Sequence, residues 1–157
     1  MTNPIVFLDF DGVVMPAKSI SEAWANNRKF IKHEVTFNKE CTDRLNTILE
    51  RSNADLVICS GWRNEEYIQA HMVEVLIANG VRLNPLKYLG ITPDINNGHR
   101  GYEIQAWIES NKFLGKFVII DDEEDMMPMM DYLVNTNSGL GITDEDVEKA
   151  LKILGIA

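Results

Sequence analysis

The chain of 157 residues carries 24 Asp and Glu against 15 Lys and Arg, a net charge of −9, and 45% of its residues are hydrophobic. This length fits a single domain over residues 1–157, and the negative charge argues against broad adhesion to a polyanion such as duplex nucleic acid. No apolar run approaches the roughly 20 residues that span a bilayer, no signal-peptide pattern opens the chain, and cysteines are few, so we expect a cytoplasmic protein with reduced thiols.

Apolar runs along the chain predict the strands. Residues 5–10, 54–60 and 116–122 form near-continuous apolar runs, which are typical of strands buried on both faces of a parallel sheet. Two weaker runs, residues 81–83 and 132–136, predict the flanking strands. The sequence therefore predicts a mostly parallel, five-stranded sheet.

Helical periodicity separates these runs. Apolar residues recur at helical spacing over residues 42–51, 65–78 and 102–109, and near the end of the chain Thr143 and Asp146 have the spacing of a helix N-cap with an acidic N3 residue. Alternating strands and helices predict an α/β fold of the doubly wound, three-layer, Rossmann-like kind, with right-handed crossovers.

Polar residues end the three strongest predicted strands. Asp9 and Asp11 follow the first, Ser60 ends the second, and Asp121 and Asp122 end the third. Because the carboxyl ends of parallel strands meet at one edge of the sheet, these side chains should lie together, where ligands bind in such folds. Clustered carboxylates repel one another, and Mg²⁺ relieves this repulsion while also binding a phosphate. The sequence thus predicts a joint Mg²⁺ and phosphate site.

Further residues are candidates for binding the phosphate. Ser60 and Gly61 stand between a strand and a helix, where a hydroxyl and free backbone N–H groups can hold phosphate oxygens, and Arg63 lies in the same turn. Arg100 begins the helix before the third strong strand and could supply a fixed cation. The plainer alternatives are an N-cap at Ser60 and a surface position for Arg100, with Lys87 as the next candidate cation.

These motifs resemble those of the haloacid dehalogenase (HAD) superfamily of phosphotransferases. The segments DFDGVV and VICSGWR, then Arg100, then VIIDD are similar to its four motifs, in the same order and on the expected elements. Within the superfamily, SGWR, RGYEIQAWI, DDEEDM and NTNSGLGITDEDVEKAL resemble the HAD domains of Swiss Army Knife RNA repair proteins. They more distantly resemble the phosphatase half of phage polynucleotide kinase-phosphatase. The likeness covers most of the chain from residue 4 to residue 154 and is thinnest over residues 15–39 and 84–99.

The resemblance implies a role for each acid. Asp9 would be the nucleophile that forms an aspartyl-phosphate and would also ligate Mg²⁺. Asp11 would be the general acid and base, and its backbone carbonyl would contact the metal. Asp122 would ligate Mg²⁺ with Asp121 beside it, although the resemblance leaves open which of these two ligates directly.

The resemblance also implies a phosphate-binding set. Ser60 and Gly61 would hold the transferring phosphoryl group, Arg100 would stabilise it, and Arg63 matches an arginine of the polynucleotide phosphatase branch. A dehalogenase activity fits less well, because a leaving-group acid at Asp11 and a metal site are features of phosphoryl transfer.

The expected function is a Mg²⁺-dependent phosphomonoesterase. Only a small lid or cap fits into residues 15–40, and such a minimal cap leaves the site open to a nucleic-acid end or a nucleotide as the phosphorylated partner. Two alternatives stay open at this point: a small-metabolite phosphatase of the same superfamily, and a receiver-like phosphoacceptor or interaction module without turnover.

Overall fold

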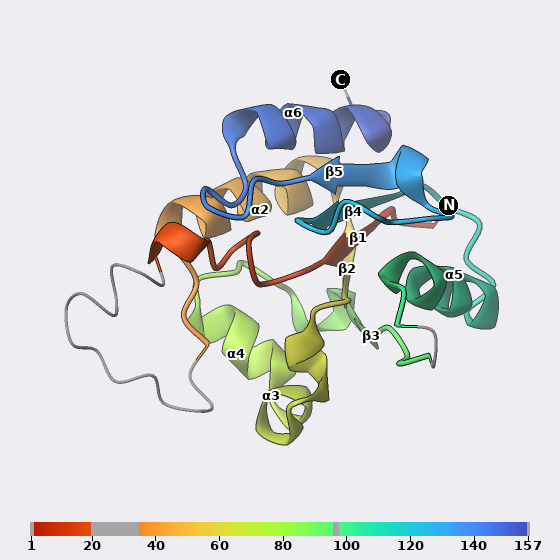
Figure 1. The fold of residues 1–157 in the computed structure, drawn as a ribbon, viewed down its shortest axis with the longest axis horizontal. Helices are drawn as coiled ribbons and strands as arrows, with labels where there is room; N and C mark the ends of the chain where they lie inside the picture. Colours follow the sequence, from red (N-terminus) through yellow and green to blue (C-terminus); the bar gives the residue numbers. More distant parts are fainter. Residues whose placement is uncertain (1, 20–34, 96–97, 157) are drawn as a thin grey trace.

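The computed structural model describes residues 2–19, 35–95 and 98–156, and its centre is one parallel sheet of five strands (Figure 1). The strands lie in the order β3-β2-β1-β4-β5, and every neighbouring pair is parallel. Their bounds are β1 (Ile5–Leu8), β2 (Asp55–Ile58), β3 (Tyr88–Ile91), β4 (Phe117–Asp121) and β5 (Leu133–Asn135). The predicted doubly wound α/β fold is confirmed.

Two hydrophobic cores cover the two faces of the sheet, because successive side chains of a strand point to opposite sides. Val6 and Leu8 pack with α2 (Lys39–Ser52), α3 (Glu66–Ala70), α4 (Met72–Ala78) and α6 (Asp144–Ile153). Ile5 and Phe7 pack with the buried face of α5 (Arg100–Ser110). Short 3₁₀ turns complete the described elements: η1 (Gly61–Asn64), η2 (Pro85–Lys87) and η3 (Met130–Tyr132).

The predicted strand at residues 81–83 is wrong, and β3 lies further along the chain. After α4 the chain turns at Gly80, whose φ is +91°, and the Val81 N–H bonds back to the Leu76 carbonyl. Val81 and Leu83 are nevertheless buried, so their apolar character reflects packing under the sheet. The true strand is a four-residue edge strand in which Gly90 interrupts a short apolar run, and its sequence therefore carries little strand signal.

The other predicted elements differ from the structure mainly at their ends. The helix expected over residues 65–78 is broken at His71 into α3 and α4, because His71 leaves the helical region with φ −123° and ψ 27°. At the N-terminus of α6, Thr143 and Asp146 form the predicted cap, in which each side chain accepts a hydrogen bond from the other residue's backbone N–H. Among the described helices, none combines the length and the apolar character that a bilayer crossing requires.

The strand order determines where a ligand crevice forms. From β1 the chain moves outward through β2 to β3, then returns to place β4 and β5 on the other side of β1. In open α/β sheets, ligands bind beyond the carboxyl ends of the strands where the winding reverses, which here is between β1 and β4. The lid or cap predicted for residues 15–40 falls largely on residues 20–34, outside the described residues.

Candidate active site

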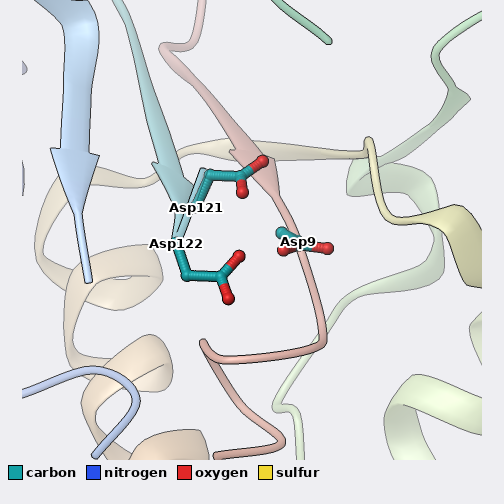
Figure 2. Close-up of side chains that lie close together, drawn as sticks. All are labelled: Asp9, Asp121 and Asp122. Atoms are coloured by element: carbon teal, nitrogen blue, oxygen red, sulfur yellow. The ribbon is translucent and has the colours of Figure 1, made fainter. Parts of the chain in front are cut away.

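Three carboxylates gather at the carboxyl ends of β1 and β4. Asp9 follows β1, Asp121 ends β4 and Asp122 comes next, and a ligand oxygen from each lies within 4.8 Å of those of the other two. Figure 2 shows the Asp121 and Asp122 side chains projecting from the end of β4 toward the end of β1, where Asp9 lies. Asp9 is 3% exposed and Asp121 is fully buried. These three carboxylates, which the sequence analysis predicted at one edge of the sheet, therefore lie close to one another.

Arg100 joins two of these acids from the first turn of α5. Its Nη1 lies 2.8 Å from Oδ2 of Asp121 and 3.3 Å from Oδ2 of Asp9. The other oxygen of Asp121 accepts a hydrogen bond from the Glu123 N–H at 2.9 Å, and the other oxygen of Asp9 accepts one from the Phe10 N–H at 2.8 Å. The predicted basic residue is therefore placed at the cluster.

Burial and mutual repulsion disfavour the charged forms of these acids. Burial, followed by the charge of Asp121, raises the pKa of Asp9 from 3.8 to about 9. The same two causes, in the same order, raise the pKa of Asp122. The thiol of Cys59 lies beneath the cluster, 3.9 Å from Oδ2 of Asp121, and burial raises its pKa well above the ordinary value, so this thiol stays protonated.

The donor set fits a hard divalent cation. Three carboxylates face one guanidinium, so the fully ionised cluster would carry an excess of two negative charges. Mg²⁺ takes oxygen ligands, and a divalent ion would neutralise this excess in a site that has little water to do so. Within the described residues, Asp9, Asp121 and Asp122 are the group with the geometry to hold a metal.

A tight turn after β1 supports the cluster from one side. Gly12 adopts φ +75°, a conformation that favours glycine, and a β-carbon at this position would overlap the carboxylate of Asp122. The carbonyl of Gly12 accepts a hydrogen bond of 2.8 Å from the buried hydroxyl of Thr136, just after β5. The turn at Gly12 therefore packs directly against Asp122 of the carboxylate cluster.

Ser60 and Gly61 occupy the loop that follows β2, the strand next to β1. Ser60 is buried, and its Oγ accepts a hydrogen bond from the backbone N–H of Trp62, which caps η1. Gly61 faces open space, because a β-carbon there would meet no atom within 4 Å. The N-cap is present, and phosphate binding by this loop stays a prediction.

The comparisons with known proteins bear on this constellation. Residues 5–147 match the family model described as the HAD domain in Swiss Army Knife RNA repair proteins. The chain belongs to this family. No match was found among curated proteins or among solved structures. Membership supports a phosphatase-type hydrolase of the HAD superfamily, and the acids at the ends of β1 and β4 coincide with the first and fourth motifs of the resemblance.

Arg63 is buried in a network of hydrogen bonds in this HAD domain, and its predicted phosphate contact stays a prediction. Its guanidinium donates to the backbone carbonyls of Cys59, Ser60 and Thr92 at 3.0 to 3.2 Å. It also pairs with the Glu103 carboxylate at 3.1 Å, with side chains that are 3% and 7% exposed. Arg63 thus links the loop after β2 to the loop after β3 and, through Glu103, to the first turn of α5. No sequence pattern indicated this network, which depends on tertiary contacts.

Lys87, the alternative cation, lies at the other end of the sheet. Its Nζ donates to the Asn53 carbonyl at 2.9 Å and lies 3.6 Å from the carboxylate of Asp55, the first residue of β2. The site is at the carboxyl ends of the strands, so Lys87 is excluded as its cation. Arg100, in contrast, lies at the carboxylate cluster.

Asp11 stands apart from the three clustered acids. Its side chain is exposed, and its carboxylate accepts hydrogen bonds from the indole N–H of Trp62, at 3.1 and 3.3 Å. The carboxylate is thus separate from the metal-type group, in keeping with a division of roles between Asp9 and Asp11. Sequence reasoning missed Trp62 as a site residue, although the SGWR segment contains it.

Proposed function

We propose that this HAD domain is a Mg²⁺-dependent phosphomonoesterase that acts through an aspartyl-phosphate on Asp9. The observation that carries the proposal is the cluster of Asp9, Asp121 and Asp122, bridged by Arg100, at the carboxyl ends of β1 and β4. These strand ends carry the segments that resemble the first and fourth HAD motifs, and residues 5–147 match the HAD family model.

The metal would be held by Asp9 and Asp122, together with the backbone carbonyl of Asp11, with Asp121 in support. Both oxygens of Asp121 already accept hydrogen bonds, one from Arg100 and one from the Glu123 N–H. Asp122 is less buried than Asp121. This difference favours Asp122 as the direct ligand. When bound, Mg²⁺ would neutralise charge that otherwise keeps a carboxylate away from a phosphate.

The reaction would proceed in two displacements at phosphorus. An oxygen of the Asp9 carboxylate attacks the phosphorus, the bond to the leaving oxygen breaks, and Asp11 gives that oxygen its proton. Asp11 then takes a proton from a water molecule, whose oxygen attacks the same phosphorus and releases inorganic phosphate from Asp9. Arg100, Ser60 and Gly61 would hold the phosphoryl oxygens during both steps.

A nucleic-acid end or a nucleotide is the substrate class we favour. The matching family is defined by domains of RNA repair proteins, which supports a phosphorylated RNA end. The net charge of −9 requires recognition to be local to the site, because it gives no general attraction for a polyanion. A small-metabolite phosphatase would use the same chemistry and differ in substrate preference.

The chemistry is tested by phosphate release from p-nitrophenyl phosphate, with Mg²⁺ and with a chelator. We expect Mg²⁺-dependent turnover that Asp9→Asn abolishes, and slower breakdown of the phosphoenzyme in Asp11→Asn. With an alkyl phosphate, whose leaving oxygen needs a proton, Asp11→Asn should slow formation of the phosphoenzyme as well. Asp131→Asn, which removes an exposed acid outside the cluster, is the matched control. Activity that survives both Asp9→Asn and chelation would contradict the proposal, and a stable phosphoenzyme without hydrolysis would favour a receiver-like module.

The substrate class needs a separate screen. Oligonucleotides phosphorylated at the 3′ or the 5′ end, mononucleotides and sugar phosphates would be compared at equal concentration with Mg²⁺. We expect the highest kcat/KM for an oligonucleotide end or a nucleotide. A clear preference for a sugar phosphate would remove the nucleic-acid assignment and support the metabolite alternative.

A further inference from the structure

The contact between Trp62 and Asp11 joins two of the motifs that the site depends on. The indole Nε1 lies 3.1 Å from Oδ2 and 3.3 Å from Oδ1 of the Asp11 carboxylate. These residues are 51 positions apart in the sequence, one after β1 and the other in η1 after β2. The carboxylate proposed as the proton donor therefore accepts its hydrogen bonds from a side chain in η1, next to Ser60 and Gly61.

Trp62 is itself anchored at both its backbone and its ring. Its N–H donates to Oγ of Ser60 at 3.2 Å, and its carbonyl accepts from the Glu65 N–H at 3.1 Å. The ring is half-buried and packs against the hydrophobic core on the α2 and α4 side of the sheet. The indole N–H is thus presented in a fixed direction.

The backbone around Asp11 is also fixed, whereas its side chain is exposed. The Gly12 N–H bonds to the Met15 carbonyl at 2.9 Å, and the Gly12 carbonyl accepts from Thr136 at 2.8 Å. An exposed Asp side chain on a fixed backbone can still rotate among its staggered conformers. Within the described part of the chain, both hydrogen bonds to this carboxylate come from Trp62, so this residue selects the conformer.

We propose that Trp62 is a positioning residue for Asp11, and this inference rests on the proposed function. By donating to the carboxylate, the indole holds Asp11 next to the loop of Ser60 and Gly61, the residues proposed to hold the phosphoryl group during both steps. Proton transfer requires the acid within hydrogen-bond reach of the leaving oxygen, and correct placement is a large part of its effect. Trp62 acts through Asp11 and takes no proton itself.

Leaving groups of different acidity separate this role from a structural one. The p-nitrophenolate ion departs without a proton, whereas an alkoxide needs one. Asp11 also acts as the base in the second displacement, so the comparison uses kcat/KM, which reports the first displacement alone. Since general acid catalysis contributes about 10²- to 10⁴-fold, we expect Trp62→Phe to lower kcat/KM for an alkyl phosphate by about tenfold or more. For p-nitrophenyl phosphate we expect less than about a threefold loss of kcat/KM, because p-nitrophenolate departs in this step without a proton.

Trp107→Phe is the matched control for this substitution. Trp107 is buried in α5 and packs edge-on against Phe7, away from Asp11, so its loss affects packing alone. We expect this variant to treat both substrates alike. If Trp62→Phe lowers kcat/KM for both substrates equally, the residue is structural and the positioning role is overturned.

A double-mutant cycle with Asp11→Asn tests whether Trp62 works through the acid. In the Asp11→Asn background, Trp62→Phe should cause no further loss with the alkyl phosphate, because the group that it positions is gone. A full additional loss would show that Trp62 acts independently of Asp11 and would overturn the inference.

An NMR measurement tests the contact without any activity. In ¹⁵N-labelled protein, Asp11→Asn should shift the indole N–H resonance of Trp62 and leave that of Trp107 in place, because of these two indoles Trp62 is the one that donates to Asp11. An unmoved Trp62 resonance overturns the inference even in an active enzyme. Absence of turnover with every phosphate ester would instead defeat the proposed function, while this resonance still reports the contact.

Discussion

Removing divalent cations should make the stability of this domain fall as the pH rises. Burial raises the pKa of Asp9 to about 9 in the folded protein, against an ordinary value of 3.8. Between these two values the folded state binds a proton that the unfolded state has released. The free energy of unfolding therefore decreases with increasing pH across this range, and the effect ends above about pH 9.

The magnitude follows from one proton. Each pH unit changes the free energy of unfolding by about 1.4 kcal/mol per proton bound, so raising the pH from about 5 to about 8 costs at most about 4 kcal/mol. The pKa of Asp122 is raised for the same reasons, burial first and the charge of Asp121 second, and its effect has the same sign. Mg²⁺ should oppose the loss, because a bound cation takes the place of the proton.

Urea unfolding in EDTA, followed by tryptophan fluorescence at several pH values, measures this slope. Other groups titrate as well, so the informative quantity is the difference between wild type and Asp9→Asn, with Asp131→Asn as the control for charge. We expect the slope of Asp9→Asn to be shallower by up to one proton, and Mg²⁺ to stabilise the wild type more at pH 8 than at pH 5. Equal slopes in wild type and Asp9→Asn would refute the reasoning.

Three further predictions concern the scaffold of the site, and each is tested by urea unfolding. Arg63→Met should destabilise by about 3 to 5 kcal/mol, because it leaves a buried carboxylate and several carbonyls without their donor; a KM change at unaltered stability would instead indicate a phosphate contact. Gly101→Ala should cost about 1 to 3 kcal/mol, since its β-carbon would overlap two backbone carbonyls, whereas Gly61→Ala meets no atom and should cost less than about 1 kcal/mol; equal costs would contradict this packing. Thr136→Val should cost about 1 to 3 kcal/mol by leaving the Gly12 carbonyl unpaired, and an unchanged midpoint would show that this bond adds nothing.

The sequence alone located the edge of the sheet where the acids gather, because the relevant rule is local. Apolar runs that end in acids mark the carboxyl ends of buried strands, and parallel strands bring those ends together whatever the details of packing. Asp9, Asp121 and Asp122 accordingly lie together, with Arg100 between two of them. The resemblance to the HAD family could likewise be identified from the sequence, because each of the four motifs is a short local segment.

Tertiary structure alone decided how the neighbouring side chains are used. An arginine next to a predicted phosphate loop reads as a phosphate ligand, yet the folded chain buries Arg63 against carbonyls from two loops and against Glu103. The hydrogen bond from Trp62 to Asp11 joins residues 51 positions apart, and no periodicity encodes such a pairing. The four-residue edge strand β3 escaped detection because Gly90 interrupts its short apolar run. Local patterns determine which residues end a strand, whereas partners distant in sequence are set only when the strands and loops pack.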